Sequence, residues 1–135
     1  MARKLPTKLE VSQMAERGED LLQVDAYLDW NGKPVYRKKW TRVRPGLYRR
    51  IIGEYEILVE ECYDEICYGD KGWIVRWTPL WIGNPSYEGQ SEFPYTTAKK
   101  AKASAEEDFT GRRLDNPKRA TNPGVPNDLV ARLKF

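Results

Sequence analysis

Two stretches of the chain have the periodic apolar residues of amphipathic helices. The first, over residues 8–22, has apolar side chains at helical spacing: Val11, Met14, Ala15, Leu21 and Leu22. Thr7 and Glu10 match a capping box at its start, and Gly18 is a point at which the helix could end early. A second helix is expected over residues 98–109, with a narrow apolar stripe that lets it lie close against a sheet: Ala98, Ala101, Ala105 and Phe109.

Between these helices, apolar and polar residues alternate as in β-strands. Alternation over residues 24–30 is followed by Asn31-Gly32, a strong hairpin signal, and then by a returning strand over residues 33–42. A two-residue turn would place Leu28 opposite Val35. The same register places other apolar residues opposite cations, so either the register slips or the hairpin projects basic side chains outward.

The rest of the sheet is expected to come from two further strands. Pro45-Gly46 predicts a turn, and residues 47–61 alternate as a half-buried strand. Another strand starts at Trp73 and ends at Thr78-Pro79. Residues 83–91 are expected to form a loop, followed by a short edge piece near Phe93.

These patterns predict a single α+β domain: an N-terminal helix, a mainly antiparallel sheet of about four or five strands, and one helix packed across it. The length of 135 residues is the usual size of one domain. We expect the compact domain to cover residues 1–111. Residues 112–135 are expected to be a basic tail, rich in Pro and Asn, that could end in a short helix. No apolar run matches a membrane span and no secretory pattern opens the chain, so we expect a cytoplasmic protein with no membrane partner.

The composition argues against most enzyme classes. The chain has no His, which excludes Ser-His and Cys-His nucleophile systems and metal sites with His ligands. It has only two Cys, Cys62 and Cys67, too few for a four-thiolate zinc site. We expect two buried thiols, in preference to a redox pair or to a metal site with carboxylates. We therefore expect a non-enzymatic protein with no catalytic residues, no metal and no cofactor.

The charges of the chain are segregated in sequence. Residues 33–50 contain eight cations and no acidic residue: Lys33, Arg37, Lys38, Lys39, Arg42, Arg44, Arg49 and Arg50. Interleaved with Tyr36, Trp40 and Tyr48, these cations could bind phosphates, or they could solvate a sheet edge and deter aggregation. Residues 54–70 contain seven acidic residues and no cation: Glu54, Glu56, Glu60, Glu61, Asp64, Glu65 and Asp70. We favour neutralisation by the basic hairpin over a surface that imitates nucleic acid.

Two groups of side chains are candidates for contact with a partner. Trp73 and Trp77 are expected to pack against the second helix. Trp81 and Tyr87 lie beyond Pro79 and are candidate anchors for a partner protein, although they could equally cover the end of the core. Arg112 and Arg113 are added to this partner-binding set. Lys99 and Lys100, at the positive end of the second helix, suggest an anionic partner, or they form its solvated face.

The run from Pro45 to Phe109 resembles a pattern found in many small phage-encoded accessory proteins. In these proteins an aromatic-rich meander of short strands leads into a helix rich in Ala and Lys. The similarity covers about half of the chain and is carried by four short segments: Pro45-Gly46-Leu47-Tyr48, Gly53-Glu54-Tyr55-Glu56-Ile57, Gly72-Trp73-Ile74-Val75 and Thr97-Ala98-Lys99-Lys100-Ala101-Lys102-Ala103. The resemblance implies a viral accessory protein, a class that often binds host machinery, including defence systems. It supplies no catalytic residues.

A second resemblance is to double-stranded-RNA-binding domains, which run helix, three strands, helix. It is carried by Thr97-Ala98-Lys99-Lys100-Ala101-Lys102, similar to the Lys-rich helix start that contacts phosphate in that family. The chain departs from the family by lacking its His between the first two strands and by having an extra basic hairpin. The resemblance is therefore one of helix chemistry.

The sequence leads to two expectations about function. The first is a phage-type accessory protein that binds and modulates a host protein or nucleoprotein complex, with inhibition of a defence system as the role that the phage resemblance implies. The alternative is direct binding of DNA or RNA through the basic hairpin and the second helix, with eight candidate residues: Arg37, Lys38, Lys39, Trp40, Arg42, Arg44, Lys99 and Lys100.

Overall fold

The computed structural model describes residues 4–62, 72–82 and 88–117, and it has the α+β fold that the sequence predicts. The described helices are α1 (Lys8–Glu16), the short 3₁₀ helix η1 (Leu21–Gln23) and α2 (Ala98–Phe109). A small antiparallel sheet pairs β1 (Ala26–Leu28) with β2 (Pro34–Tyr36). The larger antiparallel sheet has five strands in the order β3 (Thr41–Arg44), β4 (Leu47–Ile52), β5 (Tyr55–Cys62), β6 (Gly72–Pro79) and β7 (Gly89–Gln90).

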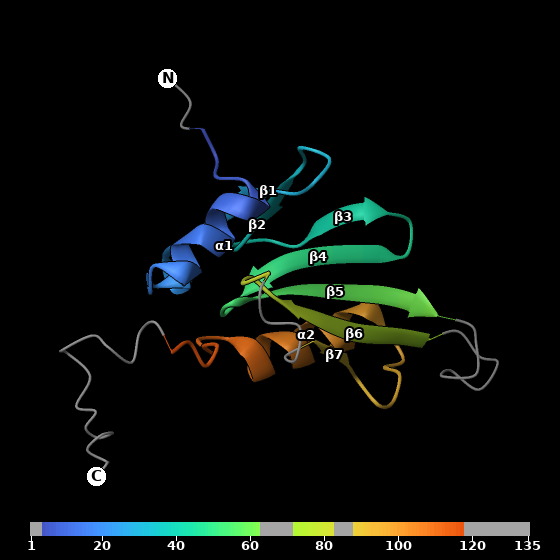
Figure 1. Cartoon of the computed structure of the whole chain (residues 1–135). Coiled ribbons are helices and arrows are strands. Elements are labelled where there is room, and N and C mark those ends of the chain that lie inside the picture. Colours follow the sequence, from blue (N-terminus) through green and yellow to red (C-terminus); the bar gives the residue numbers. More distant parts are fainter. Residues whose placement is uncertain (1–3, 63–71, 83–87, 118–135) are drawn as a thin grey trace, which may run out of the picture.

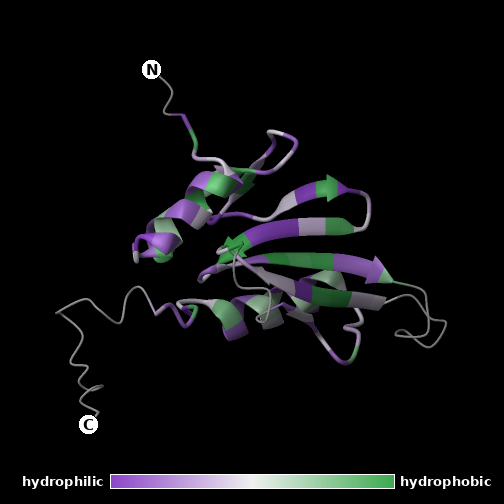
Figure 2. Cartoon of the chain, in the orientation of Figure 1, coloured by the Kyte–Doolittle hydropathy of each residue, from purple (hydrophilic) through white to green (hydrophobic). Residues whose placement is uncertain are grey.

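The five-stranded sheet has two differently covered faces. The helix α2 runs along one side of it, while α1, β1 and β2 are grouped together at one end, away from α2 (Figure 1). The register places Tyr48, Val59 and Val75 side by side on the face that α2 covers. The middle of β5 is apolar and hydrophilic residues follow towards its end (Figure 2).

Both helices form at the positions that the capping residues and the apolar spacing predict. Thr7 and Glu10 make the capping box of α1, and the Thr97 side chain accepts a hydrogen bond from the Lys100 N–H at the start of α2. The first helix is shorter than expected, because Gly18 adopts a φ of 77° soon after Glu16, and η1 follows. The predicted stripe of α2 is buried at Ala101, Ala105 and Phe109. Neither helix of the described part is long and apolar enough to cross a membrane.

The register of the first hairpin slips by one residue from that of a two-residue turn, which is one of the two alternatives that the sequence left open. Tyr27, not Leu28, lies opposite Val35. The connection is not a two-residue turn, because the Asp29 carboxylate accepts hydrogen bonds from the backbone N–H groups of Asn31 and Lys33 and thereby closes a longer loop. The returning strand over residues 33–42 is wrong: it divides into β2 and β3, which belong to different sheets.

The single strand expected over residues 47–61 is a hairpin of two strands, β4 and β5. Gly53 makes the turn between them with a φ of 63°. A Cβ atom at this position would lie 2.4 Å from the carbonyl oxygen of Phe109 and 2.5 Å from that of Arg112. The turn therefore needs glycine for its backbone conformation and also because the chain after α2 passes directly against it.

The residues after α2 continue the packed part of the chain beyond the expected boundary at residue 111. Leu114 and Asn116 are both buried, and the Asn116 side-chain amide donates to the Ala15 carbonyl. Glu54 is 0% exposed, and its carboxylate accepts from the backbone N–H groups of Leu114 (2.7 Å) and Leu21 (3.2 Å). One buried carboxylate thus joins the β4–β5 turn to η1 and to the segment after α2.

Cys62, at the end of β5, is buried and disulfide-bonded. The expectation of a free thiol is therefore wrong at this position. Cys67 lies outside the described residues, as does the expected short helix within residues 128–135.

Candidate functional site

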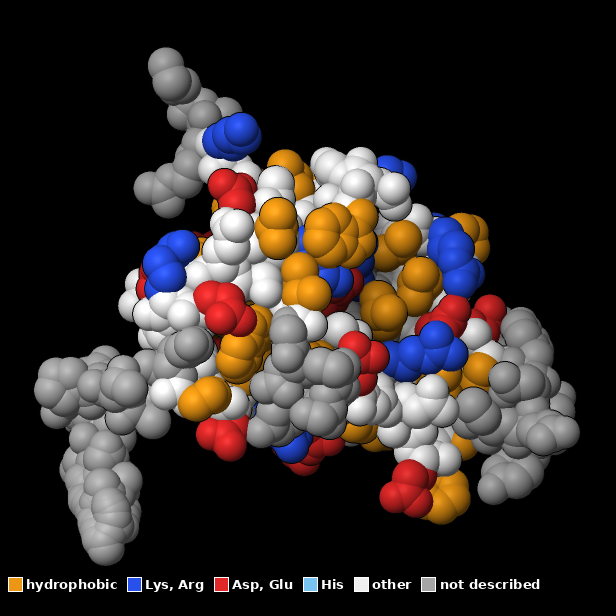
Figure 3. All heavy atoms as spheres, viewed as in Figure 1, with side chains coloured by type: hydrophobic (Ala, Val, Ile, Leu, Met, Phe, Trp, Pro, Cys, Tyr) orange, Lys and Arg blue, Asp and Glu red, His pale blue; other side chains and the backbone are white. Residues whose placement is uncertain are grey.

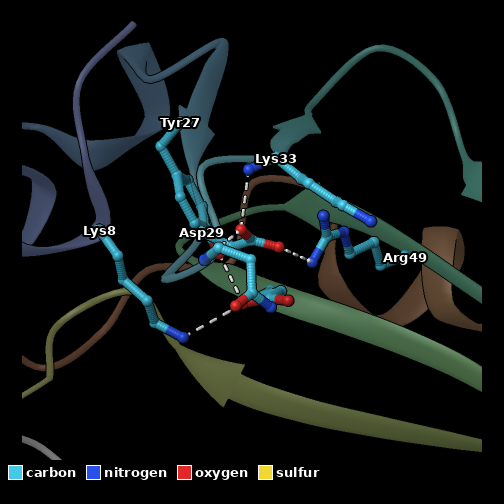
Figure 4. Close-up of polar contacts among 7 residues, drawn as sticks. Lys8, Tyr27, Asp29, Lys33 and Arg49 are labelled. Atoms are coloured by element: carbon cyan, nitrogen blue, oxygen red, sulfur yellow. Dashed lines mark hydrogen bonds and ion pairs between the residues drawn. The ribbon is translucent and has the colours of Figure 1, made fainter. Parts of the chain in front are cut away.

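A polar cluster lies between β1 and the five-stranded sheet. The Tyr27 hydroxyl donates to the Glu56 carboxylate at 2.6 Å, and the Lys8 ammonium lies 3.4 Å from the same oxygen. Beside them, Arg49 forms an ion pair with Asp29 at 2.7 Å. These side chains point toward one another from different elements (Figure 4). The cluster ties the small sheet and α1 to β4 and β5.

The electrostatics of this cluster suit a structural role. Burial, followed by the negative charge of Glu56, raises the pKa of Tyr27, so the phenol stays protonated at neutral pH and cannot act as a base. Burial opposes the charge of Asp29, but hydrogen bonds from the Lys33 N–H and from Arg49 outweigh it and lower the pKa of the Asp29 carboxyl. Each charge is matched within the cluster, which leaves no free group for acid–base chemistry.

Four cations of the basic block are engaged by other groups of the protein. Arg37 donates to the backbone carbonyls of Val24 (2.7 Å) and Leu21 (2.9 Å), although it was expected to contact phosphate. Arg44 pairs with Glu60 at 2.8 Å. The other two are Arg49, paired with Asp29, and Arg50, paired with Glu106.

Of the remaining cations of this block, Lys33 lies in the β1–β2 loop, Lys38 and Lys39 lie near Tyr36 and Asp25, and Arg42 lies on the face of the sheet that carries α2. We define the basic–aromatic surface by seven residues: Lys38, Lys39, Trp40, Arg42, Tyr48, Lys99 and Lys102. Arg42 lies opposite Tyr48 in the register of β3 and β4, so both side chains are on the face that carries α2. The Lys102 ammonium lies 3.6 Å from the centre of the Tyr48 ring and 5.8 Å from that of Trp40. The contacts of Lys102 therefore join α2 to β4 and to the segment before β3.

The other members of this surface lie next to Trp40 in sequence and one turn before Lys102 on α2. Lys38 and Lys39 directly precede Trp40 and are exposed, and the Lys39 ammonium lies 4.6 Å from the Tyr36 ring centre. Lys99 is one helical turn before Lys102 and is also exposed. Lys100 is exposed too, but the helical period places it roughly half a turn away from Lys102.

The charge of this surface is only partly balanced. Glu106 accepts from Trp40 Nε1 at 2.9 Å and from Arg50 at 2.6 Å, so its charge is matched by Arg50. Within the described residues, five cations of the surface have no ion pair with a carboxylate: Lys38, Lys39, Arg42, Lys99 and Lys102. Their combined positive charge is available to a ligand.

We compared the chain with known protein families, curated proteins and solved structures. No match is found in any of the three comparisons. In the part of the chain that the structure describes, no group of three or more Cys, Asp or Glu residues could hold a metal ion. We therefore infer function from the chemistry of the basic–aromatic surface.

The expected partner-binding residues do not form one site. Trp81 is 9% exposed, and its indole N–H donates to Glu16 of α1, so it covers the end of the core. Arg113 pairs with Asp20 at 3.1 Å, and Arg112 lies 5.0 Å from the ring centre of Phe109. Tyr87 lies outside the described residues.

The expected neutralisation of the acidic block by the basic hairpin is found between Glu60 and Arg44, while two further cation partners, Arg76 and Lys8, lie outside the basic hairpin. Glu60 pairs with both Arg44 and Arg76, and Glu56 pairs with Lys8. Asp64, Glu65 and Asp70 lie outside the described residues.

The candidate list from the sequence omitted Tyr48 and Lys102, although they hold the basic–aromatic surface together. Helical spacing alone puts Lys102 next to the apolar stripe of Ala98, Ala101 and Ala105, so the sequence did contain a signal for this residue. Its aromatic neighbours are more than fifty residues away in the chain, so only the fold brings them together.

Proposed function

We propose that this protein is a non-enzymatic nucleic-acid-binding protein that uses the basic–aromatic surface. The supporting observation is that Arg42 lies beside Tyr48 in the register and Lys102 lies over the Tyr48 ring, and that neither these two cations nor Lys38, Lys39 and Lys99 form an ion pair with a carboxylate among the described residues. Cations gathered in this way attract phosphates, because binding releases counterions from the nucleic acid.

The aromatic rings support this function by positioning charge without cancelling it. A carboxylate that paired with Lys102 would neutralise it, whereas the Tyr48 ring holds the ammonium at 3.6 Å and leaves it charged. The strand β3 adds a second exposed element at the edge of the sheet, because three of its four residues are exposed. Phosphate contacts can therefore be made from a helix and from a strand edge.

The strength of the charge effect can be worked out from the number of cations. Five phosphate contacts give a slope of about −3.5 on single strands and about −4.5 on duplexes when the logarithm of affinity is plotted against that of salt. Between 50 and 200 mM salt, affinity for a single strand then falls roughly a hundredfold. We expect fluorescence anisotropy with labelled DNA and RNA oligonucleotides to show this dependence.

The deciding variant replaces Lys38, Lys39 and Arg42 with Ala. We expect the magnitude of the salt slope to decrease by about 2 to 3, since three phosphate contacts are lost. Affinity at low salt should decrease as well. The matched control replaces Arg17, Arg76 and Arg113 with Ala, which removes the same charge from exposed positions elsewhere. The proposal is wrong if the unchanged protein retards neither DNA nor RNA at low salt, or if both triple variants bind equally.

A second candidate is binding to a host protein or nucleoprotein complex, including an anti-defence role of the kind that the phage resemblance implies. Its support is exposed apolar surface. Trp30, in the β1–β2 loop, is 68% exposed, and Val43 on β3 is also exposed. Apolar side chains gather over the strands on the face opposite α2, with charged side chains around them (Figure 3).

Capture from a host lysate with and without nuclease separates these two functions. A protein partner that stays bound after nuclease treatment and is lost with Trp30→Ala favours the second candidate. Partners that are lost on nuclease treatment, and with the triple variant of Lys38, Lys39 and Arg42, favour nucleic-acid binding.

A further inference from the structure

A cavity of about 510 Å³ lies on the opposite flank of α2 from Lys102 and Glu106. It is bounded by β6, by residues 90–95 and by α2, and its volume is in the usual range for ligand pockets. Four aromatic residues line it: Trp77, Phe93, Tyr95 and Phe109. The basic–aromatic surface contributes no residue to this cavity.

The walls of the cavity are held in place by short contacts. Tyr95 and Trp73 exchange two backbone hydrogen bonds, of 2.7 and 2.8 Å, and the Tyr95 hydroxyl lies 2.7 Å from Ser104 Oγ on α2. Gly89 lies directly on the Trp77 indole, since a Cβ atom there would come within 2.6 Å of the ring. Trp77 in turn contacts Phe109, with 5.3 Å between the ring centres. The cavity is therefore formed before a ligand arrives.

Its rim is apolar and acidic. Phe93 is 66% exposed, although most large apolar side chains of the described chain are covered. Glu92 and Asp108 are exposed at the same cavity and have no ion pair within the described residues. Among the described residues that line the cavity, none is Lys or Arg. Aromatic faces and carboxylates both attract cations, so the lining is complementary to a positively charged group with an apolar stem.

We propose that this cavity is a docking site for a basic peptide segment of a partner protein, with an Arg or Lys side chain of the peptide inserted between the aromatic walls. The guanidinium or ammonium group would lie near Glu92 and Asp108, and the methylene stem near Phe93. The neighbouring strand supports a peptide as the occupant. Because β7 is the last strand of the described sheet, its outer edge can pair with an extended backbone. The inference is independent of nucleic-acid binding, which uses the other flank of α2.

The test uses the full chain labelled with ¹⁵N and a short capped peptide of alternating Leu and Arg. We expect the peptide to shift amide resonances of residues 89–95 and 104–109, and the same peptide with Glu in place of Arg to leave them unchanged. Replacing both Glu92 and Asp108 with the matching amides should weaken binding about fivefold and reduce its salt dependence. The matched control, Glu107→Gln with Asp115→Asn, changes two exposed carboxylates that do not line the cavity and should have no effect.

Three results would overturn the proposal. The first is an absence of peptide-induced shifts at the cavity. The second is equal binding of the Arg and Glu peptides, or equal affinity of the amide variant and its control. The third is binding of tetramethylammonium at the cavity without binding of the peptide, which would assign the site to a small cation. Phe93→Ala is a further check, because it should weaken the peptide while leaving affinity for oligonucleotides unchanged.

Discussion

The β4–β5 turn offers a sharp test of the packing described above, because two glycines of the chain have similar backbone conformations and different surroundings. Gly53 has a φ of 63° and Gly111 a φ of 73°. A Cβ atom at Gly111 would meet nothing within 4 Å, whereas at Gly53 it would meet two carbonyl oxygens at 2.4 and 2.5 Å. Substitution by Ala therefore separates the cost of the backbone conformation from the cost of the close approach.

The expected magnitudes follow from these distances. A left-handed conformation costs an alanine roughly 1–2 kcal/mol, and this is the whole expected effect of Gly111→Ala. Gly53→Ala adds the displacement of the backbone at Phe109 and Arg112, a cost of about 1–3 kcal/mol. It also disturbs the hydrogen bond from the Glu54 N–H to the Arg112 carbonyl, which is 2.9 Å long. We expect Gly53→Ala to lower the free energy of unfolding by at least about 2 kcal/mol more than Gly111→Ala.

Urea unfolding followed by tryptophan fluorescence measures both variants, since the chain has five Trp. Asn tolerates a positive φ, so Gly53→Asn and Gly111→Asn provide a second pair in which the conformational cost is smaller. In that pair, Gly53→Asn should still be strongly destabilising, and Gly111→Asn should be nearly neutral. If the two glycines respond alike in both pairs, the chain after α2 does not pass against the turn as described.

Two other predictions concern buried and partly buried carboxylates. Glu54→Ala leaves two buried N–H groups without their acceptor, and we expect it to lower the free energy of unfolding in urea by about 3 kcal/mol. The control, Glu107→Ala at an exposed position, should lower it by less than about 0.5 kcal/mol. A decrease below about 1 kcal/mol for Glu54→Ala would contradict the role assigned to this carboxylate. The pKa of Asp29 is lowered in the folded protein, so its contribution to stability is present above the ordinary value of 3.8 and is lost as the pH falls through the folded value. Asp29→Asn should therefore make the loss of stability in acid less steep, as measured by urea unfolding at a series of pH values, and identical slopes would refute this assignment.

The helices could be predicted because their signals are local. The capping residues of α1 and α2 lie within three residues of the groups that they bind, and the stripe of α2 depends only on helical spacing. The alternation in β5 and β6 is also local, and it correctly separates the buried Ile57 and Val59 from the more exposed Glu56 and Glu60.

The register and the turns could not be predicted in the same way. The carboxylate of Asp29 decides the form of the first hairpin, and the sequence pattern Asn31-Gly32 favoured a shorter turn. The turn at Gly53 depends on α2 and on the segment after it, more than fifty residues away. Such contacts leave no periodic trace in the local sequence.

The sequence showed where the cations are concentrated, but it did not show which of them remain free of partners in the fold. Residues 33–50 contain no acidic residue, yet three arginines in this stretch serve the fold through Asp29, Glu106 and the carbonyls of Leu21 and Val24. Whether a cation is free depends on partners from distant segments. The sequence therefore indicates where positive charge is abundant, and the fold decides how much of it a ligand can reach.

The burial of Leu114 and Asn116 has a practical consequence for shortened forms of this protein. A chain cut after α2 would lose the N–H that Leu114 donates to Glu54 and would open the end of the core near Ala15. A chain cut after Pro117 would keep both contacts. Protease protection should therefore extend past the last helix, and the minimal folded fragment should end several residues beyond the point at which regular secondary structure stops.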